Sequence, residues 1–123
     1  MNGDSIVADT SLLINFFNGD AAARKFIERR VLFVSVITEI EVLSFPALSV
    51  ADKKLIKSFL SQCLLIDLEP EIKELTIDIR AKFKIKLPDA VIAATAIRYD
   101  LPLFTMDQSF KRVTNLKSII IEV

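Results

Sequence analysis

Short apolar runs alternate along this chain with longer segments in which apolar residues recur every three or four positions. The short runs are rich in β-branched and aliphatic residues, which favour buried strands. The longer segments have the period of helices packed on one face. Strands are predicted at residues 5–8, 31–36, 64–68, 103–105 and 118–123. Helices are predicted at residues 11–17, 20–29 and 38–45, after a cap at Ser49, after Pro70, and from Pro88 to about Tyr99.

Strands that alternate with helices in this way predict an α/β fold, because parallel strands are joined by helical crossovers that cover the sheet. We expect a three-layer α/β/α sandwich with a mostly parallel sheet of about five strands. The length fits a single domain spanning residues 1–123. Ligands of such sheets bind outside the carboxyl ends of the strands. The residues that follow strands are therefore where a site is expected.

Four acidic residues are placed at or near that edge. Asp9 closes the first predicted strand, Asp107 follows the fourth, and Glu41 lies one helical turn past the second. Asp89 begins the most apolar helix, which has to pack on the sheet. Each also has a structural interpretation. Asp9 and Asp107 could cap helices or turns, Glu41 could complete a capping box with Thr38, and Asp89 lies where a helix dipole favours negative charge.

Composition narrows the chemistry that these acids could perform. The chain has no histidine and one cysteine, Cys63, which excludes His-dependent nucleophilic catalysis, His metal ligands and an internal disulfide. With two glycines it has no Gly-rich phosphate loop. The lone cysteine and the lack of a signal-peptide pattern predict a cytoplasmic protein. No apolar stretch is long enough to cross a bilayer, so no membrane partner is expected.

Two bulk properties bear on partners. Sixteen basic residues balance sixteen acidic ones, so net charge alone predicts no nucleic-acid partner. The hydrophobic fraction of 52% is at the upper edge for a globular chain and indicates a surface covered by a partner.

Carboxylates gathered beside an apolar core repel one another and raise one another's pKa. A hard divalent cation relieves this repulsion, and Mg²⁺ combines few carboxylates with waters and phosphate oxygens. The chemistry that such a site supports is metal-assisted phosphodiester hydrolysis, which needs no histidine base.

Four motifs, in this order, resemble the PIN-domain family and in particular its VapC-type toxins of toxin–antitoxin pairs. They are VADTSLL, SVITEIEVL, LPDAVIAATA and LPLFTMDQSF, and they span essentially the whole chain. The resemblance implies a parallel α/β/α sandwich, cleavage of RNA and Mg²⁺ or Mn²⁺ as cofactor. It also implies a homodimer and a small antitoxin protein that lies in an apolar groove.

By position in these motifs, the resemblance assigns catalytic and metal-binding roles to the four acids and supporting roles to three hydroxyl residues: Asp9, Glu41, Asp89 and Asp107, with Thr10, Ser11 and Thr105. We expect Thr10 or Ser11 to cap the first helix and to leave Asp9 free to face a metal. Glu39 is a second candidate for the glutamate; Glu41 is preferred because of its register after the second strand.

The chain departs from the family pattern at two loops. Ser44-Phe45-Pro46 stands where many relatives have a small residue, and Lys86-Leu87-Pro88 stands where many have Gly and Asn. These departures affect loop shape and substrate choice. For Phe45, core packing and a partner groove are both open.

Basic residues flank two of the acids and are either RNA contacts or a solvated charged face: Lys84 and Lys86, then Lys111 and Arg112. Few aromatic residues lie beside them in sequence, so no base-stacking platform is predicted. Two other functions remain open. One is a non-catalytic PIN-like module that binds RNA or protein. The other is an aspartyl-phosphate protein, whose phosphatase form requires an acid at the position of Ser11.

Overall fold

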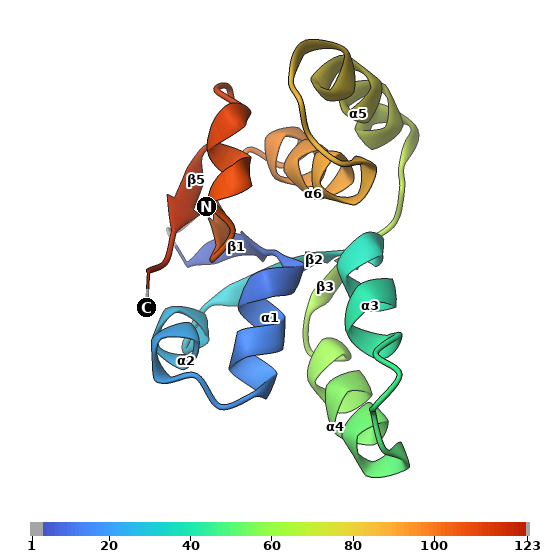
Figure 1. The fold of residues 1–123 in the computed structure, drawn as a ribbon, viewed down its shortest axis with the longest axis vertical. Helices are drawn as coiled ribbons and strands as arrows, with labels where there is room; N and C mark the ends of the chain where they lie inside the picture. Colours follow the sequence, from blue (N-terminus) through green and yellow to red (C-terminus); the bar gives the residue numbers. More distant parts are fainter. Residues whose placement is uncertain (1–3, 123) are drawn as a thin grey trace.

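A computed structural model describes residues 4–122, in which five strands form one sheet with helices on both faces (Figure 1). All neighbouring strands are parallel, and their order is β3-β2-β1-β4-β5. The strands are β1 (Ser5–Ala8), β2 (Val31–Ser35), β3 (Leu64–Ile66), β4 (Leu103–Thr105) and β5 (Ser118–Ile120). All five predicted strands are present, but three end earlier than predicted: β2 at Ser35, β3 at Ile66 and β5 at Ile120. Val123, the last residue of the predicted fifth strand, lies outside the described residues.

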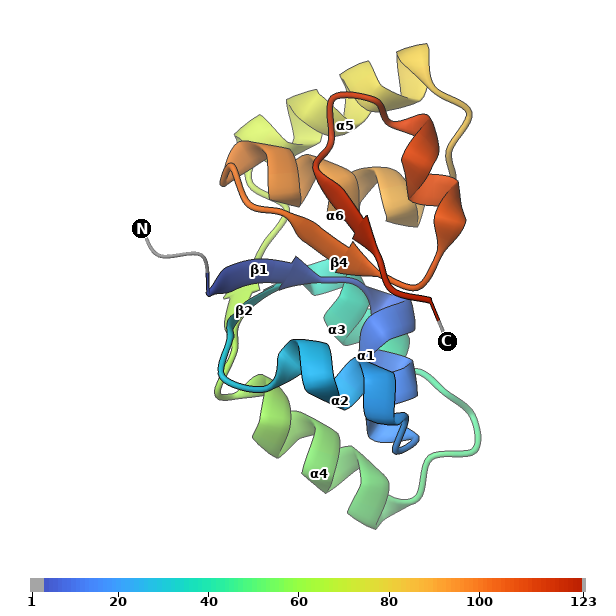
Figure 2. The same cartoon turned by 90° about the vertical axis from the view of Figure 1, so that its left-hand side faces the viewer.

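The helices form two layers, as predicted. Figures 1 and 2 show α5 and α6 on one face of the sheet and α1, α2 and α4 on the other. The helices are α1 (Thr10–Phe17), α2 (Ala21–Ile27), α3 (Val36–Leu43), α4 (Val50–Leu60), α5 (Pro70–Lys82) and α6 (Leu87–Arg98), with a 3-10 helix, η1 (Gln108–Arg112), after β4. None of the helices within residues 4–122 is long and apolar enough to cross a membrane.

The central strand β1 belongs to two hydrophobic cores, one on each face of the sheet. Val7 packs with α5 and α6, whereas Ile6 and Ala8 pack with α1, α2 and α4, and all three side chains are fully buried. Helix α6 is buried from Ala90 to Ala96, as its nearly continuous apolar sequence predicts. Because β1 is held from both faces, the residue that follows it is fixed at the middle of the carboxyl edge.

The periphery differs from the expected pattern. Strand β3 ends at Ile66 and forms the edge of the sheet, so Leu64 and Leu65 remain exposed. On α4, Leu55 is 71% exposed, although its spacing places it with the apolar residues of that helix. Local periodicity identifies apolar residues but does not show whether a neighbouring element covers each of them.

Candidate active site

Asp9 lies at the carboxyl end of β1 and is almost fully buried. Its side chain caps α1 by accepting a hydrogen bond from the Leu12 amide at 2.9 Å. The expectation that Thr10 or Ser11 caps this helix is therefore wrong. Ser11 Oγ instead donates to the Asp9 carboxylate at 2.9 Å. Burial raises the pKa of Asp9 to about 6, although these hydrogen bonds act in the opposite direction.

Thr105 connects the first acid to the last. At the end of β4, its hydroxyl donates to Asp9 Oδ2 at 2.5 Å and accepts from the Asp107 amide at 2.9 Å. Ser11 Oγ accepts from the Met106 amide at 3.0 Å, which ties the same loop to α1. Asp107 also caps η1 through the Ser109 amide. One strand end thus positions both carboxylates, and each carboxylate also caps a helix.

Glu41 is held by the first residue of α1. Thr10 Oγ1 donates to Glu41 Oε1 at 2.6 Å and lies 3.0 Å from the hydroxyl of Thr38. Ser35 caps α3, so the alternative in which Thr38 begins a capping box with Glu41 is wrong. Thr38 is not among the predicted site residues, although it is a fully buried threonine within SVITEIEVL. The signal in the sequence that could have identified Thr38 is a polar residue within an otherwise apolar motif.

Asp89 joins the cluster from the first turn of α6. Burial is the main cause that raises its pKa, and the charges of Asp107 and Glu41 add to this effect, whereas Lys86 lowers it. The Asp107 charge also raises the pKa of Asp9. Repulsion therefore links all four acids, which come from four distant parts of the chain.

The donor chemistry of this cluster suits a hard divalent cation, since carboxylate and hydroxyl oxygens surround it. Within residues 4–122, however, no three acidic or cysteine side chains converge closely enough to form a ready-made metal site. Mg²⁺ retains several waters and binds substrate phosphates, so it does not require an all-protein cage. The oxygen donors present are therefore compatible with a divalent cation that keeps most of its waters.

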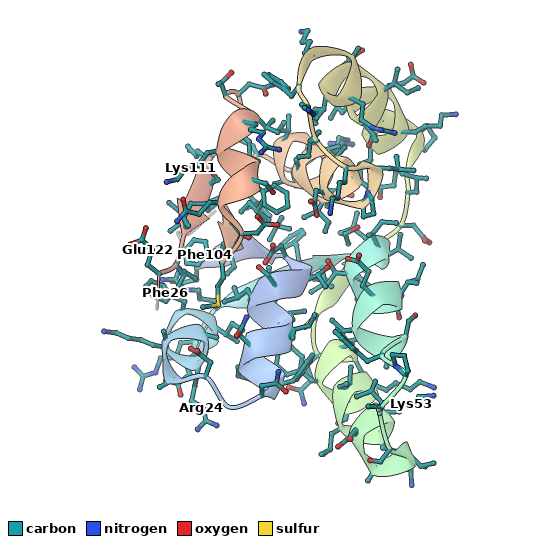
Figure 3. The ribbon with its side chains drawn as sticks, viewed as in Figure 1. Arg24, Phe26, Lys53, Phe104, Lys111 and Glu122 are labelled. Atoms are coloured by element: carbon teal, nitrogen blue, oxygen red, sulfur yellow. The ribbon has the colours of Figure 1, made fainter. Side chains whose placement is uncertain are left out.

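The four flanking basic residues are placed differently. The charge of Lys86 acts on Asp89, so it lies close to the acids. Arg112 donates to the carbonyl of Lys84 at 3.2 Å, which joins η1 to the loop before α6. Lys111 points outward beside β5, away from α6 (Figure 3). The structure thus places Lys86 next to an acid of the cluster, joins Arg112 to Lys84, and leaves Lys111 pointing away from α6.

Residues 6–116 match the family model of the PIN domain, and the chain belongs to this family. Its fold is similar to a toxin–antitoxin complex from Klebsiella pneumoniae, with 29% identity and a TM-score of 0.83 over 93% of this chain and 95% of that chain. It is also similar to DNA-bound VapBC from Salmonella typhimurium, with 20% identity and a TM-score of 0.81 over 94% and 97%.

A third similar structure, VapBC2 from Rickettsia felis bound to a promoter DNA fragment, has 21% identity and a TM-score of 0.79 over 96% of this chain and 99% of that chain. No curated protein sequence gives a significant match to this chain. The resemblance that the four motifs indicate is confirmed, as is the fold class.

Proposed function

We propose that this chain is a metal-dependent endoribonuclease that hydrolyses RNA phosphodiester bonds, and that it is the toxin of a type II toxin–antitoxin pair. One observation carries the proposal. Within a PIN domain, the charges of Asp107 and Glu41 raise the pKa of Asp89, and the charge of Asp107 raises the pKa of Asp9, in addition to the larger effect of burial. Clustered acids with raised pKa values are typical of functional sites.

In this proposal Asp9, Glu41, Asp89 and Asp107 hold Mg²⁺ or Mn²⁺. The bound ion supplies Lewis-acid activation of the scissile phosphate and of the attacking water. Thr105 keeps Asp9 and Asp107 in fixed relative positions through its two hydrogen bonds. Thr10 holds Glu41 in place through a hydrogen bond, and Ser11 holds Asp9 in the same way. Lys86, Lys84 and Arg112 hold phosphates of the flanking RNA.

The proposed partner is a small antitoxin, with a homodimer as the assembled form in the cytoplasm. Several of the similar structures are toxin–antitoxin complexes, and some of these are bound to DNA. This chain exposes large apolar side chains on α4, where Val50 is 81% and Leu55 is 71% exposed. Exposed apolar groups of this size are consistent with a surface that a protein partner covers.

Cleavage of single-stranded RNA by purified protein tests the enzymatic part. We expect Asp9→Asn to abolish Mg²⁺- or Mn²⁺-dependent cleavage and to retain the fold. On α3, Glu41→Gln should lose most of the activity and Glu39→Gln should retain it, because Glu41 alone of the pair contacts Thr10 in the described structure. Full metal-dependent activity in purified Asp9→Asn protein would overturn the proposal.

A non-catalytic module that binds RNA or protein is the second candidate, since no three acids of residues 4–122 yet converge on a metal position. Thermal unfolding with added Mg²⁺ or Mn²⁺ distinguishes the two. An enzyme of the proposed kind gains stability from the ion, and Asp9→Asn or Asp107→Asn should reduce that gain. Equal stabilisation of wild type and both variants would favour the binding module.

A further inference from the structure

An open pocket of about 360 Å³ lies directly beside the acidic cluster. It is lined by Thr10, Ile14, Glu41, Ser44, Phe45 and Pro46. Thr10 and Glu41 already belong to the candidate active site, where they hydrogen-bond to each other. The pocket is therefore an extension of that site and not a separate cavity.

The apolar lining residues of the pocket follow the two site residues, Thr10 and Glu41, along their helices. Ile14 follows Thr10 by four residues on α1, which places both side chains on one face of that helix. Phe45 follows Glu41 by four residues, just past the end of α3. Ser44 caps α3 and its hydroxyl donates to the Ile40 carbonyl, which fixes the turn that presents Phe45.

The walls of the pocket select against phosphate. Glu41 supplies negative charge, and none of the lining residues is basic. Phe45 leaves 45% of its surface exposed, and Ile14 and Pro46 add further apolar wall. Lys86, the cation whose charge acts on Asp89, lies on another element, at the start of α6. One side of the site therefore suits phosphates, and the side with Phe45 suits a flat, uncharged group.

From this arrangement we infer that the pocket binds the nucleobase of a nucleotide next to the scissile phosphate, stacked on the ring of Phe45. The inference rests on the proposed ribonuclease function and adds a base subsite to it. Single-stranded RNA exposes its bases, and proteins bind them by stacking on aromatic side chains. Phe45 is then a substrate-binding residue, and its segment, Ser44-Phe45-Pro46, is one of the two that depart from the family pattern.

Cleavage kinetics on short single-stranded RNA provide the first test. Because one stacked base is lost, KM of Phe45→Ala should rise by about 5- to 140-fold, with kcat nearly unchanged. Phe45→Trp should retain the wild-type KM, and Ile77→Ala is the control, because Ile77 is an exposed apolar residue on α5 outside the pocket. An abasic nucleotide placed on one particular side of the cleaved bond should raise the KM of the wild type. The same substrate should not raise the KM of Phe45→Ala any further.

Binding without cleavage provides the second test. An RNA carrying 2-aminopurine next to the cleavage position should lose fluorescence when it binds Asp9→Asn protein, because stacking quenches this base. The double variant Asp9→Asn/Phe45→Ala should bind without this loss. If wild type cleaves RNA, Phe45→Ala shows the same KM and the double variant shows the same quenching as Asp9→Asn, the base subsite is wrong and the pocket is left to a protein partner. If wild type cleaves no RNA under any metal condition, the proposed function fails and the subsite fails with it.

Discussion

Replacing Asp9 by asparagine is expected to stabilise the protein, although it removes the central acid of the site. Asp9 is 2% exposed, and burial raises its pKa from an ordinary value of 3.8 to about 6. Hydrogen bonds from Thr105, Leu12 and Ser11 favour the charged form but do not offset the burial, and the Asp107 charge adds to the rise. At neutral pH the folded protein thus holds a buried charge that the unfolded chain leaves in water.

The direction in which stability changes with pH follows from the protons bound by the folded and unfolded states. Between pH 3.8 and about 6, Asp9 is protonated to a greater extent in the folded protein than in the unfolded chain. The free energy of unfolding therefore falls as pH rises through that window and levels off above it. The full difference corresponds to about 3 kcal/mol. Asparagine can still accept from the Leu12 amide but matches Ser11 and Thr105 less well, at a cost of about 1 kcal/mol.

We therefore expect Asp9→Asn to be more stable than wild type by about 1–2 kcal/mol above pH 7, and to lack the decline in stability attributable to Asp9. Denaturant unfolding from pH 4 to 8 measures both, with EDTA present because a bound cation would favour the carboxylate. Asp20→Asn is the matched control, since Asp20 caps α2 in the same way but is less buried. An Asp9→Asn protein that is no more stable than wild type at pH 8 and shows the same pH slope would refute this reasoning.

Three further results are expected. Thr105→Val should lower the free energy of unfolding by about 1–3 kcal/mol, because a buried Asp9 oxygen loses one of its two hydroxyl donors and the Asp107 amide loses its acceptor; denaturant unfolding checks this. Lys86→Ala should weaken RNA binding and reduce the slope of log affinity against log salt by about one. Lys53→Ala, on α4, should change neither (Figure 3). Burial raises the pKa of Cys63 to about 11, so its reaction with a thiol reagent at pH 8 should be slow until the protein is unfolded.

The sequence by itself determined the order of the elements, the parallel sheet and the placement of the acids. Strand and helix periods are local properties, and the carboxyl ends of parallel strands necessarily share one edge. Asp9 and Asp107 could therefore be placed together without coordinates. The capping box of Ser49 and Asp52, also evident from sequence, is present at the start of α4.

Tertiary structure decided which polar atom meets which partner. Asp9, and not its hydroxyl neighbours, caps α1, and it is fixed by Thr105, a residue 96 positions away. Lys111 is near an acid in sequence but points away from α6, whereas Phe45, far from the basic residues in sequence, lines a pocket with Glu41. Periodicity fixes the face on which a side chain lies. What that face meets depends on the packing of distant segments, and this packing set the burial of Asp9, its raised pKa and the apolar wall beside the acids.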